Sequence, residues 1–186
     1  MKRIFDLTVS ILLLIVFSPL FLFVTILIKI DPKGKGPAIF KHERVGKDGK
    51  TIFVYKFRTM VEDASKIGPG LTEKDDKRIT KFGIFLRKSS LDELPQLLNV
   101  IKGDMSLVGP RPEIPEIVKT YSNFQKQVLK VKPGLTGLPQ VNGRGDLSIP
   151  KKLRLDVYYI KHQNLWLDIK IHFKTIIVVI TGKGAF

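Results

Sequence analysis

The sequence predicts an α+β protein, mainly helical, with an N-terminal membrane helix, a small β-hairpin and amphipathic helices around one further domain. Three observations lead to this fold class: an uncharged apolar run at the N-terminus, two β-rich runs around a Gly/Asp turn, and helical spacing of apolar residues elsewhere. The 186 residues are enough for one domain with a real core. We therefore divide the chain into a membrane helix at 1–30 and a membrane-associated domain at 31–186.

The composition narrows the classes of partner. Lys and Arg number 32 against 17 Asp and Glu, a formal charge of +15, so anions are the expected partners: nucleic acid, anionic lipid head groups or phosphorylated small molecules. The absence of Cys excludes disulfides, thiolate metal sites and a Cys nucleophile, and three scattered His argue against a His-rich zinc site. A mean hydropathy of +0.07 is high for so charged a chain, which indicates that the apolar residues are concentrated in segments.

The first concentration is an N-terminal run without a charged residue from Leu7 to Ile28. About 20 such residues are enough to cross a bilayer. A cleaved signal peptide would have a shorter apolar core and a small-residue cleavage site, and none precedes Lys29. A spanning helix is the default interpretation.

Two details favour a re-entrant helix instead. Ser18-Pro19 lies in the middle of the run, where proline removes a backbone hydrogen bond and kinks a helix. Both flanks are basic, which tends to keep both ends in the cytoplasm. The flanking residues are Lys2, Arg3, Lys29, Lys33 and Lys35. A kinked helix that dips into one leaflet and returns satisfies both details.

A β-hairpin is predicted next, with strands at 38–44 and 51–58 joined by the Gly/Asp turn at 45–50. In the second strand Val54, Lys56 and Arg58 share one face, because side chains alternate along a strand. Lys56 and Arg58 are either a solvated strand face or a binding surface for anions.

The remaining segments alternate between loops and helices. Residues 62–77, with Gly68-Pro69-Gly70, predict a surface loop, and 79–88 a basic amphipathic helix that includes Arg87. Further helices are expected around 116–131 and at 151–163, the latter with Asp156. The apolar segment 165–180 fits an interfacial helix with Trp166 near the lipid head groups, and a core helix is the alternative.

Asp92 and Glu93 stand at the start of a short apolar helix, in basic surroundings. Ser90 and Glu93 match a capping box, while Pro95 favours a helix start nearer Asp92. In either case the helix dipole would keep both carboxylates ionised. One interpretation is therefore structural, with Asp92 as a helix N-cap and Glu93 as a first-turn charge.

Two loops suggest chemistry instead. The loop at 103–112 presents Arg111 between Pro110 and Pro112, which fixes its direction, and Arg is a natural bidentate partner for phosphate. A carboxylate pair beside such an Arg suits Mg²⁺ together with a phosphorylated substrate. The loop at 132–145 is rich in Gly and Pro and carries Arg144, although it contains no Walker or dinucleotide pattern.

Taken together, these motifs resemble the bacterial sugar transferase family, the small monotopic polyprenyl-phosphate phosphoglycosyl transferases. The resemblance covers nearly the whole chain in order. It rests on residues 2–6, 18–19, 55–60, 90–99, 102–112, 132–137, 140–144 and 156–159. One departure is Leu138-Pro139 before Gln140, where family members commonly carry Trp or Ala, and it puts the local shape of that loop in doubt.

The resemblance implies a re-entrant helix broken at Ser18 and Pro19, on the cytoplasmic face of the bacterial inner membrane. It also implies that residues 31–186 form a catalytic domain. This domain would move a phosphosugar from a UDP-sugar to a polyprenyl phosphate such as undecaprenyl phosphate and release UMP, the first membrane step of glycan assembly.

The resemblance also implies roles for site residues. Asp92 would attack phosphorus and form an aspartyl-phosphosugar intermediate. Glu93, with Asp92, would bind Mg²⁺. Analogy and electrostatics place five basic side chains around the phosphates or uridine: Lys56, Arg58, Arg87, Arg111 and Arg144. Asp156 is a further candidate at the site.

The rival hypothesis is a membrane-tethered basic binding module in which Asp92 and Glu93 are only helix caps. Nucleic acid is disfavoured as its ligand, because the chain contains no recognised binding motif and its aromatic residues lie mainly in apolar runs. Inner-membrane lipid is an expected partner under both hypotheses, and a homodimer is a further candidate assembly.

Overall fold

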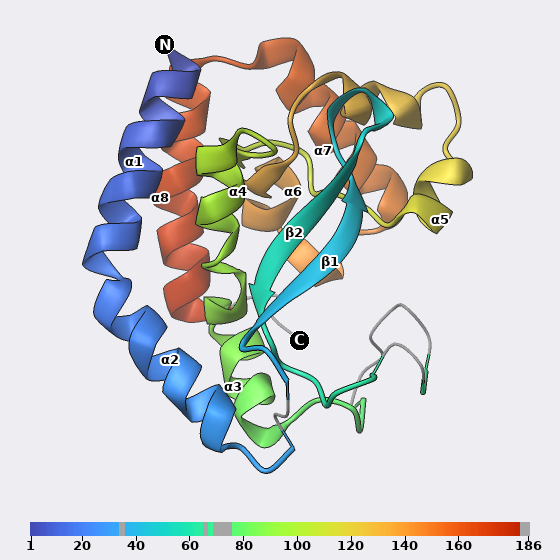
Figure 1. The fold of residues 1–186 in the computed structure, drawn as a ribbon. Coiled ribbons are helices and arrows are strands. Elements are labelled where there is room, and N and C mark those ends of the chain that lie inside the picture. Colours follow the sequence, from blue (N-terminus) through green and yellow to red (C-terminus); the bar gives the residue numbers. More distant parts are fainter. Residues whose placement is uncertain (34–35, 65–66, 69–75, 183–186) are drawn as a thin grey trace.

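The computed structural model describes residues 1–33, 36–64, 67–68 and 76–182, and it shows a mainly helical protein with a small antiparallel hairpin (Figure 1). The N-terminal run forms two helices, α1 (Lys2–Val16) and α2 (Ser18–Ile30), with a bend of 60° between them. Neither helix alone is long and apolar enough to cross a membrane, whereas the bent pair together meets the length and composition that a crossing requires.

The break at Ser18-Pro19 is confirmed, and its geometry explains how proline is accommodated. Pro19 lies in the first turn of α2, where a missing N–H costs no helical hydrogen bond. The Ser18 hydroxyl donates to the Ile15 carbonyl at 2.8 Å, so it satisfies a carbonyl at the end of α1. The proline therefore starts a second helix instead of interrupting a single one.

The predicted hairpin is confirmed as β1 (Ile39–Val45) and β2 (Thr51–Phe57), which pair antiparallel from Ile39 opposite Phe57 to Val45 opposite Thr51. The turn contains Asp48 and Gly49, both with positive φ, 57° and 78°. In this left-handed region glycine and Asp are tolerated better than most residues. The register places His42 and Arg44 on the same face as Lys56.

The predicted loop and helix after β2 are described in part. Residues 65–66 and 69–75 of the loop expected at 62–77, including Pro69 and Gly70, lie outside the described residues. Helix α3 (Lys81–Lys88) begins with Thr80, whose side chain accepts a hydrogen bond from the Gly83 N–H at 3.0 Å. It buries Leu86 and exposes Phe85, as an amphipathic helix should.

The rest of the chain consists of short elements followed by two long helices. In order, they are η2 (Leu91–Glu93), α4 (Gln96–Lys102), β3 (Ser106–Val108), α5 (Pro115–Lys119), η3 (Gln125–Lys130), β4 (Gly134–Thr136), α6 (Leu138–Val141), η4 (Arg144–Asp146), α7 (Ile149–His162) and α8 (Leu165–Thr181). Strands β3 and β4 form a parallel pair that local patterns do not predict. Helices α7 and α8 confirm the predictions at 151–163 and 165–180.

The single helix expected around 116–131 is wrong, because α5 and η3 are separate. The Thr120 hydroxyl donates to the Ile117 carbonyl and satisfies the end of α5. The Ser122 N–H then donates to Gln125 Oε1 at 2.7 Å, and the Gln125 N–H donates to Ser122 Oγ at 3.3 Å. Such reciprocal side-chain bonds start a new turn and stop the earlier helix from continuing.

The core has two parts, and the bent helix pair packs on both. The first part lies under α1 and comprises Val54, Leu97, Val100, Met105, Leu107, Val108, Tyr159 and Ile171. The second lies under α2 and comprises Val24, Ile28, Ala38, Phe57 and Leu86. The opposite face of the pair leaves large apolar side chains exposed: Ile11, Leu12, Ile15, Val16, Leu22, Phe23 and Ile26.

The side chains of the first residues of helix α1 bind partners on α8 and α4. Lys2 Nζ lies 2.6 Å from Asp168 Oδ2 of α8, and Asp168 is fully buried. Arg3 donates to the carbonyls of Val100 and Ile101 at the end of α4. The two N-terminal charges that the sequence presents as a basic flank therefore bind partners within the fold.

Helix α8 has one buried side and one exposed apolar side. Asp168 and Ile171 are buried, whereas Trp166, Phe173, Ile176 and Ile180 are exposed. The core-helix interpretation is thus confirmed for one face, and the interfacial interpretation stays a prediction for the other.

Candidate active site

Asp92 and Glu93 lie in the 3₁₀ turn η2, between α3 and α4. Helix α4 begins only after Pro95, and neither η2 nor α4 has a side-chain cap. Neither helix start considered from the sequence forms a side-chain cap: Ser90 adopts a left-handed conformation with φ of 58°, and its hydroxyl accepts a hydrogen bond from Arg144 Nη2 at 2.7 Å. Neither the Asp92 nor the Glu93 carboxylate therefore caps a helix.

Glu93 is held by two cations. Lys56 Nζ and Arg111 Nη2 each lie 2.7 Å from Glu93 Oε1, and Arg111 Nη1 lies 3.4 Å from Oε2. Burial would raise the pKa of Glu93, but Arg111 and Lys56 outweigh it and hold that pKa far below its usual range. The carboxylate of Glu93 in turn raises the pKa of Arg111.

Asp92 has a different environment, although it is the adjacent residue. It is 8% exposed, and its closest cation is Lys56, whose Nζ lies 4.0 Å from Asp92 Oδ2. Burial raises the pKa of Asp92 to about 6; Lys56 opposes this shift and the charge of Glu93 adds to it. Neighbouring carboxylates whose pKa values are pushed apart are typical of sites where each has its own role.

Two further arginines approach the pair from other elements. Arg87 Nε donates to Thr59 Oγ1 at 2.9 Å; burial lowers the pKa of Arg87, and the charge of Asp92 opposes that shift. Arg144 reaches Ser90, and its Nη1 is buried without a hydrogen-bond partner in the described part of the chain. The structure thus brings Lys56, Arg87 and Arg111 together around Asp92 and Glu93, and it places Arg144 on Ser90, which directly precedes η2.

Arg58 is the basic residue that points elsewhere. Its Nε donates to the Pro37 carbonyl at 2.8 Å, and its guanidinium lies 5.8 Å from the centroid of the Phe40 ring. These contacts are at the base of the hairpin, so a role for Arg58 at the phosphates stays a prediction.

Asp156 belongs to a second titratable group, with Glu113 and Tyr121. Burial and then Glu113 raise the pKa of Asp156 to about 7, and its Oδ1 is buried without a partner among the described residues. Burial, Glu113 and Asp156 raise the pKa of Tyr121 to about 12. Glu113 and Tyr121 line a small pocket together with Pro110, Arg111 and Pro112. The two electrostatic neighbours of Asp156, Glu113 and Tyr121, are therefore both residues of this pocket.

His42 is a site residue that the sequence interpretation did not include. Its Nδ1 lies 3.3 Å from Arg44 Nη2, and Arg44 Nη1 lies 3.6 Å from Glu113 Oε2. Burial and the charges of Arg44, Lys56, Arg111 and Arg87 lower the pKa of His42 to about 4, so it is neutral at physiological pH. One sequence signal could have identified His42 and Arg44. Side chains alternate along a strand, so these two residues are expected on one face of the hairpin, and the register places Lys56 on the same face.

A divalent cation fits this site only together with a substrate. In the described ranges no group of three or more His, Cys, Asp or Glu residues could hold a metal ion. Asp92 and Glu93 do supply hard oxygen donors, and Mg²⁺ in enzymes is often bound by one or two carboxylates plus substrate phosphates. The Lys56 and Arg111 side chains are paired with the Glu93 carboxylate. A metal ion could bind Glu93 only if the phosphate oxygens of a substrate bound these two side chains instead.

Comparison with known proteins shows the family of the chain. The sequence model of the bacterial sugar transferase family matches residues 1–182. The chain is 45% identical over 201 residues to the undecaprenyl-phosphate galactose phosphotransferase of Salmonella typhimurium, a match of 100% of this chain and 42% of that protein. It is 44% identical over 184 residues to the uncharacterized sugar transferase EpsL of Bacillus subtilis, covering 99% and 89%.

A third relative is the UDP-glucose:undecaprenyl-phosphate glucose-1-phosphate transferase of Klebsiella pneumoniae, 44% identical over 195 residues, with 100% of this chain and 41% of that protein covered. The chain thus spans less than half the length of the Salmonella and Klebsiella proteins. The family match extends over every element from α1 to α8 and includes the Asp92-Glu93 turn. The chain belongs to the bacterial sugar transferase family.

Proposed function

We propose that the protein transfers a sugar phosphate from a UDP-sugar to a polyprenyl phosphate, such as undecaprenyl phosphate, and releases UMP. One observation carries the proposal: a buried carboxylate with a raised pKa, Asp92, lies beside a carboxylate neutralised by Lys56 and Arg111. The names of the Salmonella and Klebsiella relatives, which both act on undecaprenyl phosphate, support the choice of acceptor. The step would begin the assembly of a membrane-linked glycan.

Asp92 is the proposed nucleophile. Its carboxylate oxygen attacks the sugar-proximal phosphorus, the bond from that phosphorus to the bridging oxygen breaks, and UMP leaves with the bridging oxygen. An oxygen of the polyprenyl phosphate then attacks the same phosphorus. This attack breaks the bond to Asp92, restores the carboxylate and gives a polyprenyl diphosphate sugar. A pKa of about 6 supports this role, because Asp92 is ionised at neutral pH yet more basic than an ordinary aspartate.

The basic residues are proposed to bind the diphosphate. Lys56 and Arg111 neutralise Glu93 in the free protein, and the phosphate oxygens of the substrate compete with Glu93 for both. Arg144 Nη1 is an additional donor that no described residue uses. Arg87 is held by Thr59, which limits its motion and favours a fixed contact with substrate.

Glu93, with Asp92, is proposed to hold Mg²⁺ once the diphosphate has drawn Lys56 and Arg111 away. The ion supplies charge neutralisation at the phosphate oxygens. The residues of the chain do the remaining work: Arg87, Arg111 and Arg144 orient the substrate, and Asp92 presents its oxygen to phosphorus.

The bent helix pair is proposed to place this site at the cytoplasmic face of the bacterial inner membrane. Helices α1 and α2 would enter one leaflet and return, with residues 31–186 as a catalytic domain on the membrane surface. The 60° bend, the exposed apolar face of the pair and the exposed Trp166, Phe173 and Ile176 of α8 support this arrangement. A polyprenyl phosphate would then reach Asp92 from the lipid phase.

Product analysis tests the proposal. The purified protein in detergent is incubated with Mg²⁺, undecaprenyl phosphate and each of several UDP-sugars, and nucleotides are separated by chromatography. UMP release that needs the intact Asp92 is the expected result. Release of UDP would show transfer of the sugar alone. No turnover of any sugar, with binding to anionic vesicles unchanged in Asp92→Asn, would favour a basic binding module.

A further inference from the structure

Asn99 is a polar residue in the core of the domain, and it is fully buried on α4. Its Oδ1 accepts a hydrogen bond from the Tyr55 N–H at 2.9 Å, and its Nδ2 donates to the Phe53 carbonyl at 2.7 Å. Both groups belong to the edge of β2 that faces away from β1, where β2 has no strand neighbour among the described residues. The Asn99 amide therefore takes the place of a neighbouring strand.

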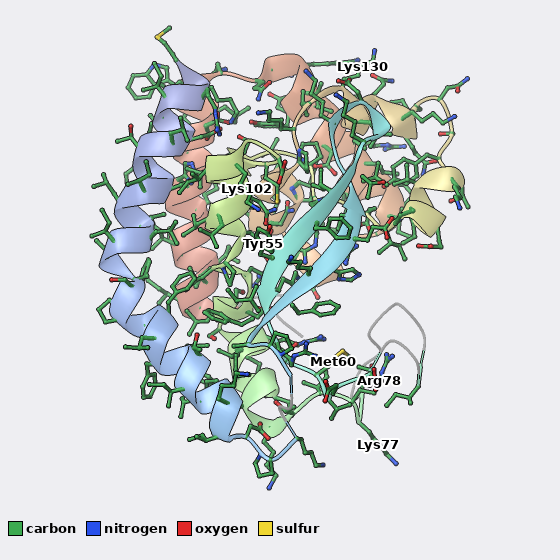
Figure 2. The ribbon with its side chains drawn as sticks, viewed as in Figure 1. Tyr55, Met60, Lys77, Arg78, Lys102 and Lys130 are labelled. Atoms are coloured by element: carbon green, nitrogen blue, oxygen red, sulfur yellow. The ribbon has the colours of Figure 1, made fainter. Side chains whose placement is uncertain are left out.

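A second contact joins the same helix to the same strand residue. Lys102, at the end of α4, donates to the Tyr55 hydroxyl, and its Nζ lies 4.6 Å from the centroid of the Tyr55 ring. Figure 2 shows the two labelled side chains lying close together between α4 and β2. Tyr55 is thus held on α4 through its backbone by Asn99 and through its side chain by Lys102.

The next residue of β2 is Lys56, whose side chain reaches the two carboxylates of η2. Lys56 Nζ lies 2.7 Å from Glu93 Oε1 and 4.0 Å from Asp92 Oδ2. A shift of β2 by one residue would turn Lys56 to the opposite face of the strand, because side chains alternate. The position of Lys56 at the carboxylate pair therefore depends on the register between β2 and α4.

We infer that Asn99 is a positioning residue, which fixes β2 against α4 and so holds Lys56 on Glu93 and beside Asp92. An apolar side chain would suit the surrounding core of Leu97 and Val100 equally well. It would leave the Tyr55 N–H and the Phe53 carbonyl without partners, and a buried amide is needed to supply one donor and one acceptor. The effect on turnover rests on the proposed function, whereas the structural coupling does not.

Asn99→Asp tests the inference, because it preserves shape and places a carboxylate oxygen where the Phe53 carbonyl needs a donor. We expect kcat/KM for UMP release to fall about tenfold in the wild-type background and less than about twofold in a Lys56→Met background, as for residues of one network. Equal losses in both backgrounds would overturn the inference. Ile171→Val, a core change in α8, should lower the Tm without lowering kcat/KM.

A cycle without turnover separates this inference from the proposed function. In the wild-type background, the change in Tm of the Lys56→Met, Glu93→Gln double variant should differ from the sum of the two single changes. In the Asn99→Asp background, the double change should equal that sum. The same non-additivity in both backgrounds would contradict the role of Asn99, even if no UDP-sugar is turned over. If Asn99→Asp does not fold, the exposed change Lys102→Met takes its place in the same cycles, with a smaller effect of the same kind expected.

Discussion

Arg111 and Glu93 form a two-point ion pair, with Arg111 Nη2 2.7 Å from Glu93 Oε1 and Arg111 Nη1 3.4 Å from Oε2. Prolines 110 and 112 flank Arg111, so the turn that carries it has little conformational freedom. Lys56 shares Glu93 Oε1 with Arg111, which means that a carboxylate from η2 joins side chains from the hairpin and from the loop after β3.

This pairing makes a prediction for Arg111. Arg111→Met should lower kcat/KM for UMP release by about 100-fold, because the substrate diphosphate loses its bidentate partner. Lys119→Met removes an equal charge from the exposed surface of α5 and should change kcat/KM less than twofold, within the effect of about 0.5 kcal/mol usual for surface changes. Similar losses in the two variants would mean that Arg111 acts only through net charge.

The pKa of Asp92 predicts a pH dependence. A nucleophilic carboxylate must be ionised, and burial raises the pKa of Asp92 to about 6. The kcat/KM for UMP release should therefore be constant above pH 7 and should fall about tenfold per pH unit well below 6. A profile that stays flat down to pH 5 would mean that Asp92 does not act as an ionised group in the free protein.

The same shift predicts a cost in stability. A raised pKa means that the folded protein binds the Asp92 proton more tightly than the unfolded chain. The stabilisation is then fully present below the unfolded pKa of 3.8 and is lost as the pH rises through about 6. Asp92→Asn, which cannot ionise, should raise the free energy of unfolding at pH 8 by on the order of 3 kcal/mol and change it little at pH 4.

Thermal unfolding of Asp92→Asn at the two pH values checks this. Asp156→Asn is an informative companion, because burial and Glu113 raise the pKa of Asp156 from 3.8 to about 7, so its stabilisation should grow as the pH rises above 3.8 and be complete only above about 7. A loss of stability in Asp92→Asn at pH 8 would show that Asp92 makes a stabilising contact as an anion.

The arrangement in the membrane gives a labelling prediction. The chain contains no cysteine, so single cysteines can be introduced without background. One is placed at Lys33 and the other in an N-terminal extension, because Lys2 itself is paired with Asp168. A membrane-impermeant thiol reagent should label both only after the cytoplasmic side is opened. Labelling of one position in intact cells would establish a spanning helix.

Local patterns were sufficient for much of the fold. The Ser18-Pro19 break, the hairpin, α7 and α8 follow from proline, from a Gly/Asp turn and from apolar spacing, each of which acts over a few neighbouring residues. The parallel pairing of β3 with β4 could not be predicted from local sequence patterns. Each strand has only three residues, and residues 109–133 separate them in the chain, so no local pattern encodes the contact.

The site likewise has features that the sequence predicted and features that it did not. Motif resemblance predicted roles for Asp92 and Glu93, and analogy and electrostatics predicted the basic residues, but neither indicated which cation binds which carboxylate. That pairing depends on the packing of β2 on α4. The Ser90–Glu93 match to a capping box, one of two helix starts considered, does not form, and the Ser90 hydroxyl accepts a hydrogen bond from a distant residue, Arg144. His42 was missed, since its neutral state depends on burial and on four surrounding cationic side chains.

The central claim is that Asp92 carries the phosphosugar during the reaction. Protein, Mg²⁺ and a UDP-sugar that supports UMP release are combined without polyprenyl phosphate, quenched, and analysed by intact mass and peptide mapping. The account predicts one phosphosugar on the peptide that contains Asp92, one equivalent of UMP, no adduct in Asp92→Asn, and loss of the adduct when undecaprenyl phosphate is added. UMP release only when both substrates are present, with no adduct on the protein, would contradict it and indicate direct transfer.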